Sequence, residues 1–205
     1  MYVYIYVLTR DYGFAPNPFY GICTLATCKP RIRKSAKIDD WVLGIGSKTT
    51  HQNRLIYLMR VTKKITYNEY WENPEYSIKK PFMKGSLKRM YGDNIYYLDP
   101  HNNSWVQSDS HHSYANGVTN YHNLNRDTKS NSVLISSEFY YFGKDAITIP
   151  EKFKDSIYKS RRGYCKETFS KIHSEFILYI KGNFEQGYNS DPILFNSFQR
   201  YNGVT

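Results

Sequence analysis

The first residues of the chain alternate between aliphatic and aromatic side chains. Between residues 2 and 8, Val and Ile fall on one face of an extended segment and Tyr falls on the other. β-branched and aromatic residues in this pattern predict a central strand over residues 2–8. The apolar stretches 41–47 and 54–62 predict two further buried strands, the second from a regular alternation of faces.

Four segments carry helical signals. Pro30 suits the first position of a short helix over residues 29–34, whose cationic face is expected to be exposed. Residues 67–71 predict a single helical turn, and a proline opens a predicted helix over 150–158. The segment 168–181 has apolar residues at helical spacing, with its first residue as the N-cap and a glycine directly after it.

The middle of the chain has weaker periodicity. Residues 79–131 are rich in Gly, Asn, Ser, His and Lys and predict mainly loops, with short strands at 94–98 and 105–107. Strand character returns at 132–142 and 146–149. Strands in runs, with helices placed between and after them, predict the α+β fold class.

The order of these segments predicts one domain over residues 1–205. A sheet-rich core of residues 1–150 is followed by a helical C-terminal part, residues 151–205, packed on it. We expect the core to be a curved, mostly antiparallel sheet or an open barrel with flanking helices. A chain of this length can bury a core without disulfides or a structural metal.

The charge balance favours an anionic partner. The chain of 205 residues has 28 Lys and Arg against 18 Asp and Glu, a formal net charge of +10. Its longest apolar run is far shorter than the roughly 20 residues of a membrane span, so we expect no membrane partner. No secretory leader opens the chain, and three cysteines do not make a disulfide framework, so we predict a cytoplasmic protein. The sequence assigns no oligomeric state.

Aromatic residues make up 17% of the chain, including 21 Tyr. Such rings pack into cores and also stack on bases. The loop 9–21 combines four aromatic residues with two prolines, and loops of this length in compact domains are usually functional. We predict a pocket here that binds a nucleobase or nucleotide, although these rings also suit simple packing of the loop. In this pocket Asp11 or Asn17 would contact the polar edge of the base. The predicted pocket residues are Arg10, Asp11, Tyr12, Phe14, Asn17, Phe19, Trp41, Ser47, His111 and His112.

Lysine and arginine gather in three stretches, 29–37, 79–89 and 152–166, and the first two contain no acidic residue. Such stretches are often solvated surface, but three of them on a basic chain favour contact with phosphate. Guanidinium groups can bind phosphate through two parallel hydrogen bonds. The predicted phosphate-binding residues are Lys29, Arg31, Arg33 and Lys34.

Signals for catalysis are weaker. The segment 44–49 departs from the phosphate-binding P-loop because Ser47 separates Gly46 from Lys48, so nucleoside triphosphate hydrolysis is set aside. Four histidines lie within 101–122, but their spacing matches no metal-ligand pattern, and we predict no metal and no cofactor. If the protein is an enzyme, the acid–base candidates are Asp109, His111 and His112, and Cys23 or Cys28 is a secondary candidate nucleophile.

The order of elements over about residues 1–75 resembles the PUA superfamily, in particular its EVE, ASCH and YTH branches. The resemblance lies in the aromatic-rich loop, the basic short helix, and the acidic turn before a strand that ends in Ser47. Members of that superfamily bind nucleic acid and often hold a modified base in an aromatic-walled pocket. The resemblance implies a PUA-like core and a modified nucleic acid as partner.

Residues 8–19, 28–33 and 108–113 more closely resemble the second of the nucleotide-modification-associated domain families. That family occurs in phage and bacterial contexts linked to DNA base modification. The resemblance implies a partner that is a nucleotide, a modified base or nucleic acid, in a bacterial or phage-infected cell. We favour binding over catalysis. Two alternatives stay open: an enzyme acting on a nucleotide or modified base, and a defence or counter-defence protein that sequesters a nucleotide signal.

Overall fold

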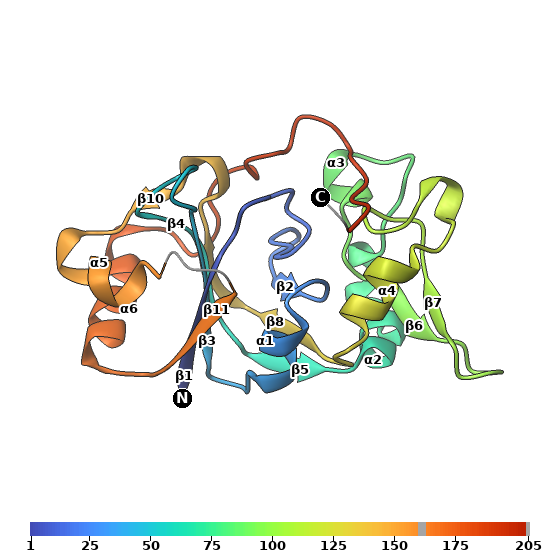
Figure 1. Cartoon of the computed structure of the whole chain (residues 1–205), viewed down its shortest axis with the longest axis horizontal. Helices are drawn as coiled ribbons and strands as arrows, with labels where there is room; N and C mark the ends of the chain where they lie inside the picture. The colour runs from blue at the N-terminus through green and yellow to red at the C-terminus, as the bar shows by residue number, and fades with distance from the viewer. Residues whose placement is uncertain (160–162, 204–205) are drawn as a thin grey trace.

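The structure, a computed structural model, describes residues 1–159 and 163–203 (Figure 1). In this part of the chain the strands form three sheets, and the largest has the order β11-β1-β3-β4-β9-β12, with β10 paired to β4. Most strand pairs are antiparallel, while β1 with β3 and β9 with β12 are parallel. The strands of this sheet are β1 (Tyr2–Val7), β3 (Trp41–Ile45), β4 (Arg54–Arg60), β9 (Glu138–Tyr141), β10 (Ile147–Thr148), β11 (Tyr164–Thr168) and β12 (Gly187–Tyr188).

The large sheet is covered on both faces. The aliphatic residues of β1, Val3 and Ile5, pack with the helices α5 (Glu151–Ile157) and α6 (Lys171–Asn183) on one side. Figure 1 shows these helices at the left of the sheet. Tyr4 and Tyr6 of β1 face the opposite side and pack against the smaller sheet and its helix, while Tyr2 at the start of the strand is exposed. Alternation within one strand therefore builds both cores, as the sequence predicts.

Strand β4 departs from regular alternation. Gly44 of β3 pairs with Tyr57, but the next residue of β3, Ile45, pairs with Leu55. Ile56 is the extra residue of a bulge, which shifts the faces of the strand at that point. Leu55 consequently packs on the same side as Leu58, against the strict alternation predicted for residues 54–62.

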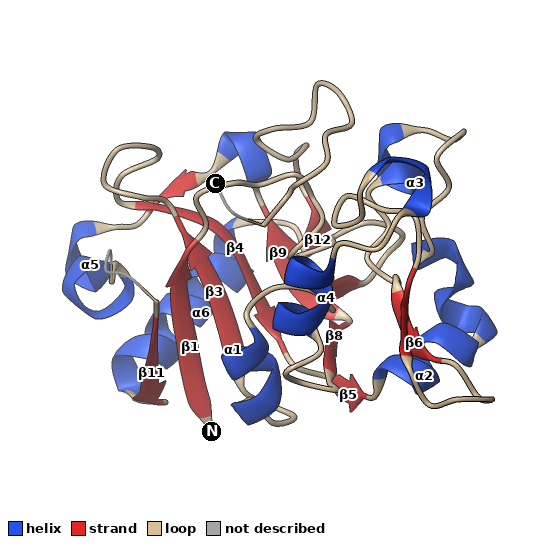
Figure 2. Ribbon diagram, turned by 45° about the vertical axis from the view of Figure 1, so that its right-hand side comes forward, coloured by secondary structure: helices blue, strands red, loops and turns tan. Residues whose placement is uncertain are grey.

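The second and third sheets lie beyond the tyrosine face. Figure 2 shows helix α1 in front of the large sheet and β6 with α2 at the far end. The second sheet has the order β2-β8-β5, and the third is the pair β6-β7. Their strands are β2 (Cys23–Leu25), β5 (Lys63–Ile65), β6 (Tyr96–Leu98), β7 (Trp105–Gln107) and β8 (Val133–Ser136). The helices here are α1 (Pro30–Ser35), α2 (Tyr67–Glu72), α3 (Leu87–Met90) and α4 (Tyr121–Asp127), with short 3₁₀ turns at Pro74–Lys79, Ala115–Gly117 and Gly143–Asp145.

The C-terminal segment connects the two ends of the molecule. After α6 and β12 it crosses the top of the structure and reaches the side of α3 and α4 (Figure 1). Its backbone is tied down on the way, since the Leu194 N–H donates to the Asp11 carbonyl and the Tyr201 N–H to the His111 carbonyl. Within the predicted helical part, residues 151–205, the helices are therefore α5 and α6, and the described residues after β12 are irregular, with turns and bends.

The mixed α+β class predicted from the sequence is confirmed. Within the described residues none of the sheets closes into a barrel, and the PUA-like likeness stays a prediction. The helix predicted at 168–181 begins later, at Lys171, with Ser170 as its N-cap. Two unpredicted helices, α3 and α4, lie in the segment 79–131. In the described chain, no helix combines the length and apolar character needed to cross a bilayer.

Candidate functional site

A cavity of about 540 Å³ lies where five separate parts of the chain meet. One wall of the cavity consists of the end of β1 and the loop after it. The rest of the lining comes from the start of α1, the segment before α4, α4 itself and the C-terminal segment. This volume is in the range of about 300–1,000 Å³ typical of small-molecule sites. The lining residues are Val7, Leu8, Thr9, Arg10, Tyr12, Phe14, Ala15, Cys28, Lys29, His111, His112, Arg126 and Tyr201.

Cys28 stands in a tight turn between β2 and α1. Its backbone φ is 54° and that of Lys29 is 40°, a left-handed conformation that costs non-glycine residues about 1–2 kcal/mol each. The turn is held by two hydrogen bonds: the Cys28 N–H donates to Asp127 Oδ1 at 3.0 Å, and Arg33 Nε donates to the Cys28 carbonyl at 2.8 Å. Backbone outliers of this kind are concentrated at functional sites.

Cys28, His112 and Asp127 form a connected row. The Sγ of Cys28 lies 3.8 Å from Nε2 of His112, and Nδ1 of the same ring lies 2.8 Å from Oδ2 of Asp127. The side chains of His112 and Asp127 are only 1% and 0% exposed. Asp127 also accepts from the Tyr96 hydroxyl at 3.0 Å. A thiol, an imidazole and an orienting carboxylate in this order are the parts of an activated nucleophile.

The charges of this row stabilise one another. Burial raises the pKa of the Asp127 carboxyl, but the charge and hydrogen bond of His112, then the charge of Arg126, hold it well below its ordinary value. Burial lowers the pKa of His112, but Asp127 and then Cys28 raise it to about 9. Burial, and to a lesser extent the charge of Asp127, raise the pKa of the Cys28 thiol, but the charge and hydrogen bond of His112 together with the charge of Arg126 bring it below its ordinary value. The surroundings therefore favour a thiolate paired with an imidazolium.

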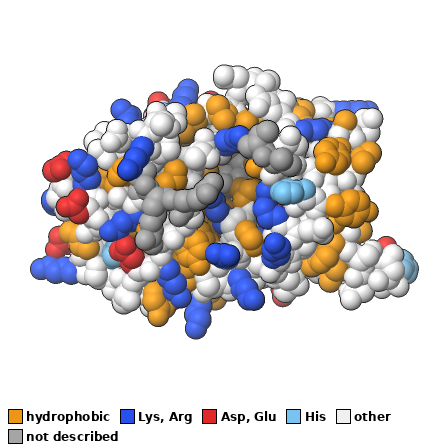
Figure 3. All heavy atoms as spheres, in the orientation of Figure 1, with side chains coloured by type: hydrophobic (Ala, Val, Ile, Leu, Met, Phe, Trp, Pro, Cys, Tyr) orange, Lys and Arg blue, Asp and Glu red, His pale blue; other side chains and the backbone are white. Residues whose placement is uncertain are grey.

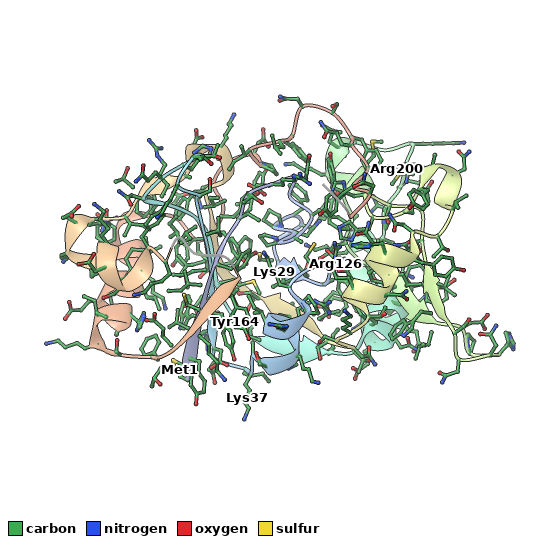
Figure 4. All side chains as sticks on the ribbon, viewed as in Figure 1. Met1, Lys29, Lys37, Arg126, Tyr164 and Arg200 are labelled. Atoms are coloured by element: carbon green, nitrogen blue, oxygen red, sulfur yellow. The ribbon has the colours of Figure 1, made fainter. Side chains whose placement is uncertain are left out.

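Three cationic side chains surround the cavity. Arg126 donates from Nη2 to Cys28 Sγ at 3.9 Å and from Nε to Asp127 Oδ1 at 3.1 Å. The Lys29 ammonium lies 4.4 Å from the centre of a buried tyrosine ring, and burial lowers its pKa. The exposed Arg10 places its guanidinium 5.2 Å from the centre of the Tyr201 ring. Figure 4 shows Lys29 and Arg126 close together between α1 and α4, and Figure 3 shows Lys and Arg side chains gathered on the centre of this face.

Aromatic rings form the rest of the wall. Phe14 contacts His111 and His112 at centroid distances of 4.9 and 4.6 Å, and Tyr12 lies 4.8 Å from His111. Burial, and then the charge of His112, lower the pKa of His111 to about 3, so this ring is neutral at pH 7. Its Nδ1 donates to the Gln199 carbonyl at 2.5 Å, which leaves Nε2 as an acceptor. The cavity thus offers flat rings and a neutral acceptor beside positive charge.

Of the predicted pocket residues, Arg10, Tyr12, Phe14, His111 and His112 are brought together at the cavity. Three other predicted pocket residues of the same loop are buried and stabilise the conformation of the loop. Asp11 is 2% exposed and accepts from the Tyr141 hydroxyl at 2.6 Å, and burial raises its pKa to about 6. Asn17 is fully buried and accepts from Lys79 Nζ at 2.7 Å. Phe19 is 2% exposed and packs inside the loop cluster. These three residues do not line the cavity, so the prediction that Asp11 or Asn17 contacts a base is corrected.

Trp41 and Ser47 also lie away from the cavity. Trp41 is 4% exposed and belongs to the core between the large sheet and α6. Ser47 follows β3 and hydrogen-bonds within its own turn, with Thr49 at 3.0 Å and Thr50 at 3.1 Å. The parallel pairing of β1 with β3 sets Ile45 beside Val7, but Ser47, two residues further along the chain, is not among the lining residues of the cavity. Neither residue is part of the site that we describe.

Arg33 is a structural residue, contrary to its predicted role as a phosphate ligand. Its side chain is fully buried and donates to four backbone carbonyls. These carbonyls belong to Cys28 at 2.8 Å, Ser130 at 2.9 Å, Ser132 at 2.7 Å and Asp127 at 2.5 Å. Because the helix α1 turns this guanidinium inward, it joins the β2–α1 turn to the end of α4.

The other members of the basic stretches divide between surface and interior. Lys29 lines the cavity, whereas Arg31 and Lys34 are exposed on α1 outside the cavity wall. Lys79 is fully buried, and burial lowers its pKa to about 8. Two members of the third stretch, Arg161 and Arg162, lie outside the described residues. Among the residues that the structure describes, the basic stretches therefore do not form one continuous cationic face, because Arg33 and Lys79 point into the interior.

Three important residues of the site were not singled out from the sequence: Arg126, Asp127 and Tyr201. Asp127 ends α4 and Tyr201 lies in the irregular C-terminal segment, and neither belongs to a sequence motif that could indicate its role. The predicted acid–base candidate Asp109 is not among the lining residues and pairs with Arg200 at 2.7 Å. Contacts between residues 28, 112 and 127 are set by the tertiary fold, so no sequence spacing reveals them.

The same three side chains carry atoms that can bind metals. One donor atom from each of Cys28, His112 and Asp127 lies within 4.8 Å of the other two. However, the thiol contacts one ring nitrogen of His112 and the carboxylate contacts the other, so the ring lies between its two neighbours. A metal would need all three donors to point to one centre. The observed contacts favour proton transfer and charge pairing over metal binding.

Fold and site together define a mixed α+β protein with a basic, aromatic-walled cavity and a thiol in its wall. The model of the family described as nucleotide modification associated domain 2 matches residues 1–199, and the chain belongs to this family. The closer of the two resemblances seen in the sequence is thereby confirmed. Neither the curated proteins nor the solved structures contain a match.

Proposed function

We propose that the protein binds a nucleotide in this cavity, as part of nucleotide modification in a bacterial or phage setting. The observation that carries the proposal is the meeting of three cations, Arg10, Lys29 and Arg126, with aromatic rings in one cavity of nucleotide size. The family to which the chain belongs is associated with nucleotide modification. Cations and flat rings are the two chemical features that recognise the phosphate and the base.

The two ends of the ligand have separate partners. The base lies against Tyr12 and Phe14, where stacking on an aromatic side chain contributes about 1–3 kcal/mol. The phosphate lies near Arg10, the exposed cation at the cavity entrance. The neutral His111 offers an acceptor to a donor group on the base.

Calorimetric titration with the four deoxynucleoside monophosphates, at low and moderate salt, tests this proposal. We expect Arg10→Ala to weaken binding about 10- to 100-fold, from the 1.5–3 kcal/mol of a hydrogen bond to a charged group. Arg31→Ala is the matched control, because Arg31 is also an exposed arginine but lies outside the cavity wall. Equal losses in both variants would contradict binding in the cavity.

Salt dependence separates a mononucleotide from a polymer. A single phosphate contact gives a shallow dependence of affinity on salt, whereas a protein that neutralises many phosphates loses affinity steeply. Binding to oligonucleotides alone, with a steep slope, would assign recognition to the exposed cations such as Lys34. A nucleotide-sequestering protein would bind in the same cavity but release its ligand unchanged, so analysis of the recovered nucleotide distinguishes it.

A further inference from the structure

We propose that Cys28 is a catalytic nucleophile, whose sulfur adds to carbon 6 of a pyrimidine nucleotide held in the cavity. The inference rests on the proposed function, since the ligand must first bind there. It goes beyond binding by naming the reacting atom and the class of base. The structural observation behind it is the contact of the Cys28 thiol with His112, Arg126 and the open cavity.

Cys28 differs from the other two cysteines of the chain. Cys23 and Cys165 are buried in the cores at 0% and 2% exposure, and neither lines the cavity. Burial raises the pKa of Cys23. Cys28 alone combines access to the cavity with an imidazole at 3.8 Å and a guanidinium at 3.9 Å. Reactive cysteines are found in such electropositive and accessible surroundings, whereas structural cysteines are inert.

The network around His112 has a form that simple packing does not require. A buried neutral imidazole can satisfy its two ring nitrogens with uncharged groups, but His112 contacts a carboxylate through Nδ1 and a thiol through Nε2. Charges buried in this way are expensive to desolvate, and hydrophobic residues often replace them without loss of stability. The chain also maintains the left-handed backbone at Cys28 and Lys29. These features set the thiol at the cavity wall in an activated state.

The chemistry of a thiolate selects the reacting carbon. Sulfur is a soft nucleophile, while the phosphorus of a nucleotide is hard and carries negative charge around it. The sugar carbons are saturated and have poor leaving groups. In a pyrimidine, the C5=C6 double bond is conjugated to C4, so C6 accepts a soft nucleophile by conjugate addition. A purine has no equivalent double bond outside its aromatic rings.

The addition is balanced without an oxidant or a further reactant. The Cys28 sulfur forms a bond to C6, the C5=C6 π bond breaks, and its electron pair moves toward C5 and the substituent on C4. C5 then takes a proton from water or from the His112 imidazolium. In reverse, C5 loses either of its hydrogens as a proton, the π bond forms again, and the sulfur leaves as the thiolate. The net result is exchange of the C5 hydrogen with solvent. Before C5 takes the proton, the adduct is an anion with a nucleophilic C5, and an electrophilic modifying group can be attached there in place of the proton.

Hydrogen exchange at C5 in D₂O tests the proposal. The full chain is incubated with dUMP, dCMP or dGMP, and deuterium in the recovered nucleotide is measured by mass spectrometry and NMR, beside calorimetric binding of the same nucleotides. We expect exchange at C5 of dUMP or dCMP and none in dGMP. Cys28→Ser should lower the exchange rate about 100-fold or more while binding changes little, because serine keeps the shape of the site but is a poor nucleophile. Cys23→Ala is the matched control and should exchange as the unaltered protein does.

The outcomes separate this inference from the proposed function. Pyrimidine nucleotides that bind without exchanging C5 hydrogen, or exchange that persists in Cys28→Ser, would refute the nucleophile and leave nucleotide binding intact. Absence of binding by all the nucleotides would refute both. Exchange in a single-stranded oligonucleotide but not in mononucleotides would show that the substrate is the polymer, and it would refute the proposal that a mononucleotide reacts in the cavity. A stoichiometric zinc ion lost in Cys28→Ser would show that the thiol is a metal ligand, which also overturns the proposal.

Discussion

Replacing Asp127 by Asn tests the charge pairing at the centre of the site. The side chain keeps its shape, but the charge beside His112 is removed. Asp127 is the strongest of the groups that raise the pKa of His112 from 6.5 to about 9, and that rise corresponds to about 3 kcal/mol in favour of the imidazolium. When the Asp127 charge is removed, we expect burial to dominate the pKa of His112 and the ring to be neutral at pH 7. The Cys28 thiol then loses the neighbouring positive charge that lowers its pKa, and this loss outweighs the smaller, direct effect of the Asp127 charge, which raises the pKa of Cys28.

The rate of alkylation of Cys28 by iodoacetamide, followed by mass spectrometry from pH 5 to 10, measures this effect. The rate in the unaltered protein should rise with pH through a pKa below the ordinary thiol value. In Asp127→Asn we expect the curve to move by about one pH unit or more to the alkaline side, and the rate at pH 6.5 to fall about tenfold. The other charged or titratable groups near Cys28 and His112 are unchanged in the variant, and they include Arg126, Lys29, Arg33, His111, Tyr6, Tyr67, Tyr96 and Tyr201.

Asp109→Asn is the matched control, since Asp109 lies outside the cavity wall and pairs with Arg200 instead. It should leave the alkylation curve in place. Superimposable curves for Asp127→Asn and the unaltered protein would refute the argument that Asp127 acts on Cys28 through His112. A curve that moves equally in both variants would show a general effect of net charge.

Two predictions concern stability. Arg33→Met leaves four backbone carbonyls without this donor, and the hydrogen bonds to two of them, those of Ser130 and Asp127, are fully buried. At about 1–3 kcal/mol for each buried unsatisfied group, we expect urea unfolding to show a loss of about 2 kcal/mol or more. Arg31→Met on the exposed face of α1 should change stability by about 0.5 kcal/mol or less. Equal effects would contradict the structural role of Arg33. Burial raises the pKa of Asp11 to about 6 in the folded chain, so its protonated form contributes stability fully below the unfolded pKa of 3.8, and that contribution is lost as the pH rises through 6. Relative to Asp11→Asn, the unaltered protein should therefore lose about 3 kcal/mol of unfolding free energy between pH 3.5 and 8, and a constant difference would refute this.

The sequence predicts the elements whose signals are local. The alternation of side chains in β1 predicts a strand and the proline at the start of α1 predicts a helix, and the structure confirms both. The bulge at Ile56 cannot be predicted in this way, because it depends on the pairing of β4 with β3. Helix α4 also escapes it, since its Asn-rich sequence has weak helical propensity and is held by the surrounding fold.

The site could be predicted only in part for the same reason. The aromatic and proline content of the loop after β1 predicts a binding loop, and its residues Arg10, Tyr12 and Phe14 do line the cavity. Arg33 shows the limit of charge patterns, because an arginine in a basic stretch has the same sequence signal whether it is solvated or fully buried. Asp127 depends on the position of α4 against the Cys28 turn, and no feature along the chain fixes that position.

The path of the C-terminal segment has a consequence for the biogenesis of the protein. Every other residue of the cavity wall leaves the ribosome before Tyr201, and the wall is incomplete until the stretch after β12 has crossed from the α6 side to His111. A nascent chain can therefore form the cores on both faces of the large sheet while its ligand site is still missing one side. Only a chain that has been translated through Tyr201 and has closed this last crossing presents the finished cavity to a ligand.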